Sequence, residues 1–211
     1  MRREYVFDDG GMNLLSSSAL RAIRDALPND ATLFLFRSGR PNLFAAGADM
    51  AEMAKFTAWD AYDFATRGQE LFAAIERLPC VTVAVIDGDC FGGALDLALA
   101  FDLRFATPRS RFSHPGAKIG IVTGFGGTSR WRNVLTRAAA HQLFLANRVF
   151  TAEEALAMGL VDRVGEDHAQ ELARLETLDP ALTATVKTLA RDGARLTRAE
   201  LLHLAGSRWD L

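Results

Sequence analysis

The chain has 211 residues, of which 49% are hydrophobic and 24% charged, a balance typical of one large globular domain or one domain with a small appendage. Its 24 Lys and Arg against 26 Asp and Glu leave a formal net charge of −2, which argues against nucleic acid or an anionic membrane as a partner. The most apolar stretch, residues 81–101, contains three aspartates, and the amino terminus lacks the apolar region of a signal peptide, so we expect a cytoplasmic protein without a membrane span.

The first predicted elements are strands and the helix between them. Two apolar runs, residues 33–36 and 81–86, lack polar alternation and predict central parallel strands covered on both faces. Residues 57–78 carry apolar side chains at three- and four-residue steps, which predicts the helix that connects these strands. Asp87-Gly88 ends the second strand, and residues 92–101 are expected to form a short buried helix.

Short strands and then helices are predicted in the second half. Residues 103–106 and 111–113 are candidate strands on either side of a turn. Residues 136–145 form an amphipathic run, and the capping box at residues 151–154 predicts the start of another helix. A brief extended segment is expected at residues 161–164.

The tail is predicted to be helical. Asp179-Pro180 is an N-cap followed by proline at the first helical position, and Gly193 marks the expected end of that helix. A second capping box at residues 197–200 predicts a last short helix. The chain is therefore divided into an α/β core, residues 1–164, and a helical C-terminal region, residues 165–211.

The two cysteines, Cys80 and Cys90, are too few for a disulfide framework or a cysteine-ligated cluster. Both lie among apolar residues, so we expect buried thiols and no metal site.

Three glycine-rich passages are candidates for chemistry: residues 44–50, 87–96 and 120–128. None contains the dinucleotide-binding or Walker motif. Gly92-Gly93 lies at a strand-to-helix junction, where amides at a helix N-terminus suit a developing negative charge. Tight packing of the strand against the helix explains the same glycines equally well.

The order and spacing of these passages resemble the crotonase family of acyl-CoA thioester enzymes, the enoyl-CoA hydratase and isomerase superfamily. The resemblance runs from about residue 13 to residue 164. Its strongest parts are Phe44-Ala-Ala-Gly-Ala-Asp-Met-Ala-Glu-Met53, then Val85-Ile-Asp-Gly to Gly92-Gly93 with Asp102, then Phe112-x-x-Pro115, Gly120 and Gly124-Phe-Gly-Gly-Thr128. Residues 145–164, with Gly159-Leu-Val-Asp162, match the usual end of the family's core. It implies an α/β fold with a crotonase-like ββα spiral core and an unusually short C-terminal helical region.

The resemblance also implies the position of the reacting carbonyl. In the family, two backbone amides hold the thioester oxygen, and the matching residues here are Ala48 and Gly93. Two fixed amides in a water-poor pocket stabilise the negative charge of an enolate without reorganising.

The acid/base positions depart from the hydratase pattern. Hydratases use two glutamates, and this chain has Asp96 at the first position and Gly116 at the second. Family isomerases often use one carboxylate, usually at the position of Gly116, and decarboxylating members can lack both. We therefore expect isomerase-like or decarboxylase-like chemistry rather than hydration, which needs two carboxylates to hold and deprotonate water.

Three further side chains have alternative roles. His114 lies two residues before Gly116 and is a candidate for proton transfer, or else a structural histidine. Asp96 either pairs with a partner such as an arginine or faces the active-site cavity, because an unpaired buried carboxylate is costly. Asp49 is expected to cap the next helix rather than only orient its loop.

The resemblance implies that coenzyme A enters as part of the substrate and not as a separate cofactor. Ala46, Ala48 and Lys55 are the residues expected to contact it, with Lys55 substituting for a lysine that family members carry where Ala51 stands here. Apolar stripes in the tail predict a homotrimer or a dimer of trimers.

Two other functions compete with a thioester enzyme. One is a catalytically silent crotonase-fold protein that binds a thioester or a partner subunit. The other, a serine hydrolase, is disfavoured because Ser113-His114 lacks a nucleophile elbow.

Overall fold

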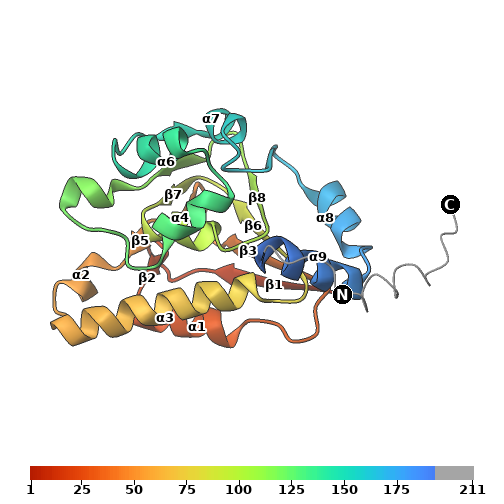
Figure 1. Ribbon diagram of the computed structural model, residues 1–211, viewed down its shortest axis with the longest axis horizontal. Helices are drawn as coiled ribbons and strands as arrows, with labels where there is room; N and C mark the ends of the chain where they lie inside the picture. The colour runs from red at the N-terminus through yellow and green to blue at the C-terminus, as the bar shows by residue number, and fades with distance from the viewer. Residues whose placement is uncertain (193–211) are drawn as a thin grey trace, which may run out of the picture.

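A five-stranded parallel sheet lies at the centre of the computed structural model, which describes residues 1–192 (Figure 1). In spatial order its strands are β1 (Arg2–Phe7), β3 (Leu33–Ser38), β6 (Val81–Ile86), β8 (Leu103–Ala106) and β11 (Arg163–Val164). The predicted apolar runs thus form the interior strands β3 and β6, which pair in register from Leu33 opposite Val81. Strands covered on both faces need no polar alternation.

Two helices cover one face of this sheet. Helix α3 (Ala58–Glu76) makes the predicted crossover from β3 to β6, and a capping box between Thr57 and Asp60 fixes its start. Helix α1 (Ser17–Asp25), capped by Ser16, packs beside α3 (Figure 1). Their buried apolar side chains meet the phenylalanine-rich side of the sheet, where Phe34 and Phe36 are fully buried.

Shorter strands form a second layer, which positions the site. Its four-stranded sheet has the order β10 (Phe150–Thr151), β9 (Arg111–Ser113), β7 (Asp89–Phe91) and β4 (Leu43–Ala45). A separate pair joins β2 (Leu14–Leu15) to β5 (Gly47–Ala48). Helix α4 (Gly93–Ala98) follows β7 directly and ends three residues before the predicted boundary at residue 101.

Six further helices complete the described part: α2 (Met50–Met53), α5 (Gly127–Arg130), α6 (Arg137–Phe144), α7 (Ala152–Ala157), α8 (Ala169–Glu176) and α9 (Pro180–Asp192). Short 3₁₀ turns occupy Pro115–Ile119 and Trp131–Asn133. Thr136 and Thr151 cap α6 and α7 as their positions predict. The expected helix end at Gly193 and the capping box at residues 197–200 lie outside the described residues.

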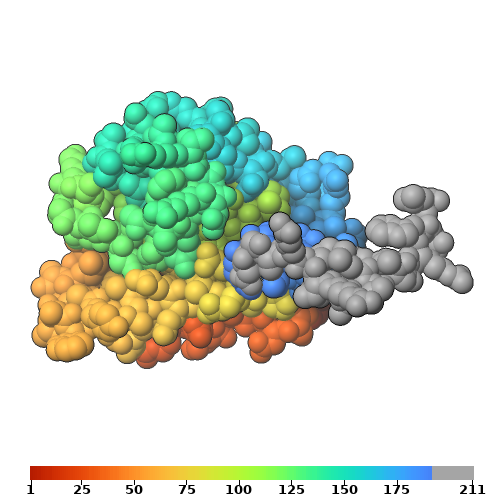
Figure 2. Space-filling model, in the orientation of Figure 1, coloured from red at the N-terminus to blue at the C-terminus, as the bar shows by residue number. Residues whose placement is uncertain are grey.

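The last two described helices pack against the central sheet. Leu172 of α8 is buried with Leu33, Val83 and Phe105 on the face opposite α3. From α9, Lys187 pairs with Asp102 at 2.6 Å. Figure 2 shows α9 in blue against the yellow segment around the end of α3. The division of the chain at residue 164 stays a prediction, since α8 shares a core with the strands.

Cys80 and Cys90 are both buried free thiols, as expected. Burial raises the pKa of both, and that of Cys90 lies well above its usual range. Within residues 1–192, no helix is both long and apolar enough to cross a membrane.

Candidate active site

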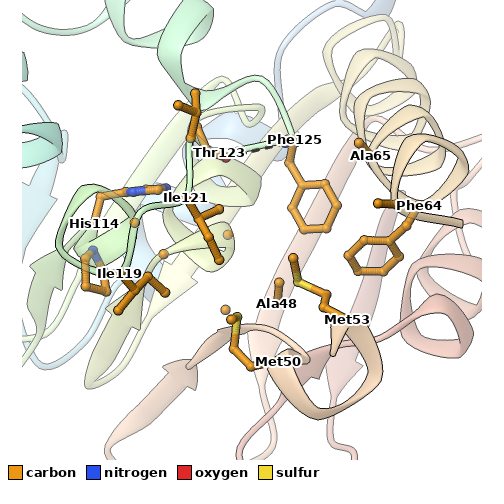
Figure 3. A pocket seen from close by; sticks show the side chains of 18 of the residues that line it. Ala48, Met50, Met53, Phe64, Ala65, His114, Ile119, Ile121, Thr123 and Phe125 are labelled. Atoms are coloured by element: carbon orange, nitrogen blue, oxygen red, sulfur yellow. Dashed lines mark hydrogen bonds between the residues drawn. The ribbon is translucent and has the colours of Figure 1, made fainter. Parts of the chain in front are cut away.

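A cavity of about 310 Å³ lies between helix α3 and the segments that follow the short strands β5, β7 and β9. Its walls come from the segment β5–α2, the start of α4, the first half of α3 and the loop of residues 114–125. In Figure 3, Met50 and Met53 lie on one side, Phe64 and Phe125 on another, and His114 faces them across the hollow. Among the described residues that line it, His114 and Thr123 alone have polar side chains. The cavity therefore suits an apolar ligand with few polar groups.

The amides of Ala48 and Gly93 come together at this cavity, as the resemblance implies. A Cβ atom on Gly93 would lie 3.3 Å from the Ala48 nitrogen, and one on Gly47 would lie 3.2 Å from the Gly93 nitrogen and 2.8 Å from the Phe91 carbonyl oxygen. Gly47 also has φ +107, a conformation that side chains disfavour. Gly93 is the first residue of α4, so its N–H has no acceptor within the helix.

Asp49 caps the helix that follows Ala48. Its side chain accepts hydrogen bonds from the amides of Ala51 at 2.9 Å and Glu52 at 3.0 Å. The predicted capping role is confirmed. By starting α2 at Met50, the cap fixes the direction of the chain that leaves the Ala48 amide.

Asp96 is completely buried on α4 and does not line the cavity. Its Oδ2 accepts a hydrogen bond from the Thr123 hydroxyl, and its Oδ1 lies 3.3 Å from His114 Nε2. Of the two alternatives expected for this residue, the structure shows the pairing, with Thr123 and His114 as partners in place of an arginine. Gly127 packs directly on the carboxylate, because a Cβ there would overlap it.

His114 and Gly116 both line the cavity, although a 3₁₀ turn beginning at Pro115, and not the expected extended segment, joins them. The side chain is 5% exposed and packs on the Phe144 ring with centroids 4.8 Å apart. Neither His114 Nε2 nor Asp96 Oδ1 makes a hydrogen bond, although the two atoms face each other. The buried pair is therefore unsatisfied in this arrangement.

Gly116 has no room for a side chain. A Cβ there would lie 2.7 Å from the Ile121 carbonyl oxygen and 3.2 and 3.3 Å from His114 Cε1 and Nδ1. The position that carries a glutamate in hydratases is thus filled by the histidine ring and by a backbone carbonyl.

Phe125 is a wall residue that sequence reasoning missed. Its ring packs against Phe64 and Phe72, with centroids 5.1 and 5.5 Å away, and against Gly68 in the middle of α3, where a Cβ would overlap the ring. Gln69 holds the same loop by donating to the Gly124 carbonyl oxygen at 2.6 Å. A glycine inside an amphipathic helix was the signal for this close contact.

The residues expected to contact coenzyme A divide into two groups. Ala46 and Ala48 line the cavity. Lys55 is exposed, follows α2 and lies outside the lining, so its contact stays a prediction. Across residues 1–192, no group of three or more His, Cys, Asp or Glu residues could hold a metal ion.

Comparison with known proteins connects this geometry to one family. A family model described as Enoyl-CoA hydratase/isomerase matches residues 19–202. The chain is 34% identical over 165 residues to crotonyl-CoA hydratase of Syntrophomonas wolfei, covering 76% of this chain and 64% of that protein. It is 35% identical over 177 residues to mitochondrial methylglutaconyl-CoA hydratase of Rattus norvegicus, covering 81% of this chain and 56% of that protein. The chain thus spans less than two thirds of the length of these curated relatives.

Solved structures share the fold. Pseudomonas aeruginosa DspI aligns with a TM-score of 0.85 and 27% identity, covering 97% of this chain and 87% of that one. An enoyl-CoA hydratase from Thermoplasma volcanium aligns with a TM-score of 0.87 and 24% identity, with the same coverages of 97% and 87%.

Proposed function

Because the chain belongs to the enoyl-CoA hydratase/isomerase family and has the crotonase fold, we propose that it acts on an acyl-CoA thioester by stabilising an enolate. The observation that supports this most directly is the approach of the Ala48 and Gly93 amides at the wall of an apolar cavity. Coenzyme A enters as part of the substrate, with Ala46, Ala48 and Lys55 as its expected contacts.

The two amides supply the electrostatic part of the reaction. When a proton leaves the carbon next to the thioester, or when a carboxylate is lost from it, negative charge moves onto the carbonyl oxygen. Two backbone donors that point at this oxygen stabilise the charge, and losing one such donor typically costs about 10²- to 10³-fold in rate. The apolar lining strengthens the effect because it excludes competing water.

Isomerase- or decarboxylase-type chemistry fits the cavity better than hydration. Hydration requires groups that hold and deprotonate a water molecule, and no carboxylate lines the cavity in the described part of the chain. The curated relatives named above carry hydratase names, and those names describe the relatives' own activity. Gly116 and the buried Asp96 are the features that separate this site from the two-glutamate pattern.

The proposal is tested by binding and by product analysis. Calorimetry with butyryl-CoA, crotonyl-CoA and octanoyl-CoA measures binding, with free coenzyme A as the control for contacts outside the cavity. The products of a 3-enoyl-CoA, a malonyl-type CoA and crotonyl-CoA then separate isomerisation, decarboxylation and hydration. We expect binding of the thioesters and turnover of one of the first two. Efficient hydration of crotonyl-CoA would contradict the preferred chemistry, and absence of binding would overturn the thioester proposal.

The second candidate function is a thioester-binding protein without turnover. It is favoured by Gly116, which has no side chain at the position where hydratases, and usually isomerases, of the family carry a carboxylate. Binding of the thioesters with no product and no exchange at the α-carbon would support it.

A further inference from the structure

We propose that His114 is the group that exchanges the α-proton of the substrate, and that Asp96 is a positioning residue that holds the imidazole. This inference rests on the proposed function and names the proton carrier of the same site. It assigns the acid/base role to a side chain outside both glutamate positions of the hydratase pattern.

The first observation is the place of the ring. His114 is the one titratable side chain among the described residues that line the cavity. Its Cε1 and Nδ1 atoms lie 3.2 and 3.3 Å from the point where a Cβ of residue 116 would stand. The imidazole edge therefore occupies the space in which a side chain at position 116 would begin. Glycine at 116 is what makes this position available to the ring.

The second observation is the buried partner. Asp96 Oδ1 lies 3.3 Å from His114 Nε2, and neither atom has a hydrogen-bond partner. A fully buried carboxylate requires compensation, and the Thr123 hydroxyl supplies it on the other oxygen only. A small rotation of the ring aligns an N–H at Nε2 with Asp96 Oδ1 and leaves the Nδ1 lone pair on the opposite edge, beside Gly116.

The surroundings of the ring leave Asp96 as its electrostatic partner. Phe144 of α6 packs on one face of the imidazole, and Gly116 and Ile121 contribute backbone near its edge. Thr123 is neutral. Asp96 is thus the one charged group that the described contacts place against His114, and its free oxygen is an acceptor for an N–H of the ring.

The chemical step balances within the substrate and this pair. The α-carbon–hydrogen bond breaks, the proton forms a bond to Nδ1, and the electron pair moves through the α-carbon onto the thioester oxygen held by the Ala48 and Gly93 amides. The reverse step returns the proton to the α-carbon, or to another carbon of a conjugated dienolate in an isomerisation. After exchange of the Nδ1 proton with solvent deuterium, the returned atom is a deuteron.

The test measures hydrogen–deuterium exchange at the α-carbon of butyryl-CoA in D₂O by mass spectrometry. Three variants are compared with the wild type: His114→Gln, Asp96→Asn, and His141→Gln as a matched control on the exposed face of α6. We expect the wild type and His141→Gln to exchange at the same rate. His114→Gln should lose about 10²- to 10⁴-fold while it still binds butyryl-CoA.

Asp96→Asn distinguishes positioning from a merely structural role. Without the carboxylate, no partner holds the imidazole with its free nitrogen toward the substrate, so kcat for exchange should fall while KM changes little. An Asp96→Asn variant with the kcat of the wild type would show that Asp96 does not act through His114.

The outcomes separate this inference from the proposed function. If the wild type does not bind any thioester, the proposed function fails. If the wild type binds and exchanges while His114→Gln exchanges equally fast, the function stands and the inference is overturned. If the wild type binds without exchange, the inference is also overturned and the silent thioester binder remains.

Discussion

Phe125 reaches its place in the cavity wall because Gly68 leaves a gap in α3. The ring also approaches Gly93, where a Cβ would lie 3.0 Å from it. One aromatic side chain therefore connects the crossover helix to the proposed oxyanion amide. A glycine in a helix interior costs about 1 kcal/mol relative to alanine, and the fit of this ring is its structural reason.

Replacing Gly68 by alanine should destabilise the protein and weaken thioester binding. The added methyl group overlaps the Phe125 ring, and overpacking of this kind costs about 1–3 kcal/mol, more than the gain in helix propensity. Urea unfolding and calorimetry with butyryl-CoA measure the two effects. Gly11→Ala is the control, because its added Cβ meets only ordinary contacts. Equal unfolding midpoints for both variants would show that Phe125 moves aside freely.

Gly116→Glu should not create hydratase activity. Its Cβ would lie 2.7 Å from the Ile121 carbonyl oxygen and against the His114 ring, so the carboxylate cannot be added without moving both. We expect no increase in crotonyl-CoA hydration and a loss of about 1–3 kcal/mol in unfolding free energy. Ala117→Glu, exposed on the same turn, should change stability by less than about 0.5 kcal/mol. A Gly116→Glu protein that folds normally and hydrates crotonyl-CoA would refute the steric argument.

Local spacing predicted the cap at Asp49, but it did not predict which residues bury Asp96. Asp49 was predictable because a cap acts within three residues of itself. His114 and Gly116 both line the cavity, but a 3₁₀ turn that begins at Pro115 places them there instead of the extended segment that was expected. The burial of Asp96 depends instead on Thr123 and Gly127, more than 25 residues away, whose loop closes over it. No local pattern contains such a contact.

At the scale of elements, three predicted helix starts are confirmed and the short strand at residues 111–113 was predicted, whereas three other short strands were missed. Thr57, Thr136 and Thr151 each accept a backbone hydrogen bond at the predicted start of a helix. The strands β4, β5 and β7 have two or three residues each, too few to display a period of two. They form because larger elements bring their backbones together.

Helix α8 begins at a buried histidine that makes its packing sensitive to acid. His168 packs on Phe105 of β8, with ring centroids 5.1 Å apart. Burial, assisted by Arg163, lowers the pKa of this histidine. The folded protein therefore favours neutral His168. Between the unfolded pKa, about 6.5, and the lower folded value, the unfolded chain binds more protons, so stability falls as pH falls through this window.

His168→Gln should remove this part of the acid sensitivity. We expect the wild type to lose more unfolding free energy between pH 7 and pH 5.5 than the variant does. Urea unfolding at both pH values measures the difference, and His141→Gln, an exposed histidine, should retain the slope of the wild type. Identical slopes for all three proteins would show that His168 does not couple protonation to folding.

For the whole molecule, the order of the glycine-rich motifs predicted the spiral core. Glycines are required where two backbone segments come close together, so their spacing along the sequence is characteristic of the fold. The C-terminal helices were less predictable. Leu172 is buried on the sheet, whereas Leu178, Leu182 and Val186 are 46%, 53% and 56% exposed. Leu172 therefore packs within its own core, and the remaining stripe keeps the prediction of an oligomer open.

The protein should form a homotrimer or a dimer of trimers through this stripe. Burying exposed leucine and valine side chains between copies is favourable at about 25 cal/mol per Å² of apolar area. Light scattering over a range of concentrations measures the mass, and Leu182→Glu with Val186→Glu should shift it toward the monomer. Thr188→Glu, an exposed position on the same helix, is the control. A wild-type monomer at every concentration would contradict the prediction.

The approach of Ala48 and Gly93 has a consequence for how this protein tolerates mutation. Because the proposed anion-stabilising contacts come from backbone groups, neighbouring side chains such as Met50, Met53 and Ile121 could vary and reshape the cavity while those contacts persist. Gly47 and Gly116 are exceptions, since a Cβ on either would lie 2.8 or 2.7 Å from a backbone carbonyl oxygen and Gly47 also has φ +107. A complete substitution library should therefore show a permissive pocket around these two intolerant glycines, the pattern that lets a lineage change its substrate without rebuilding its chemistry.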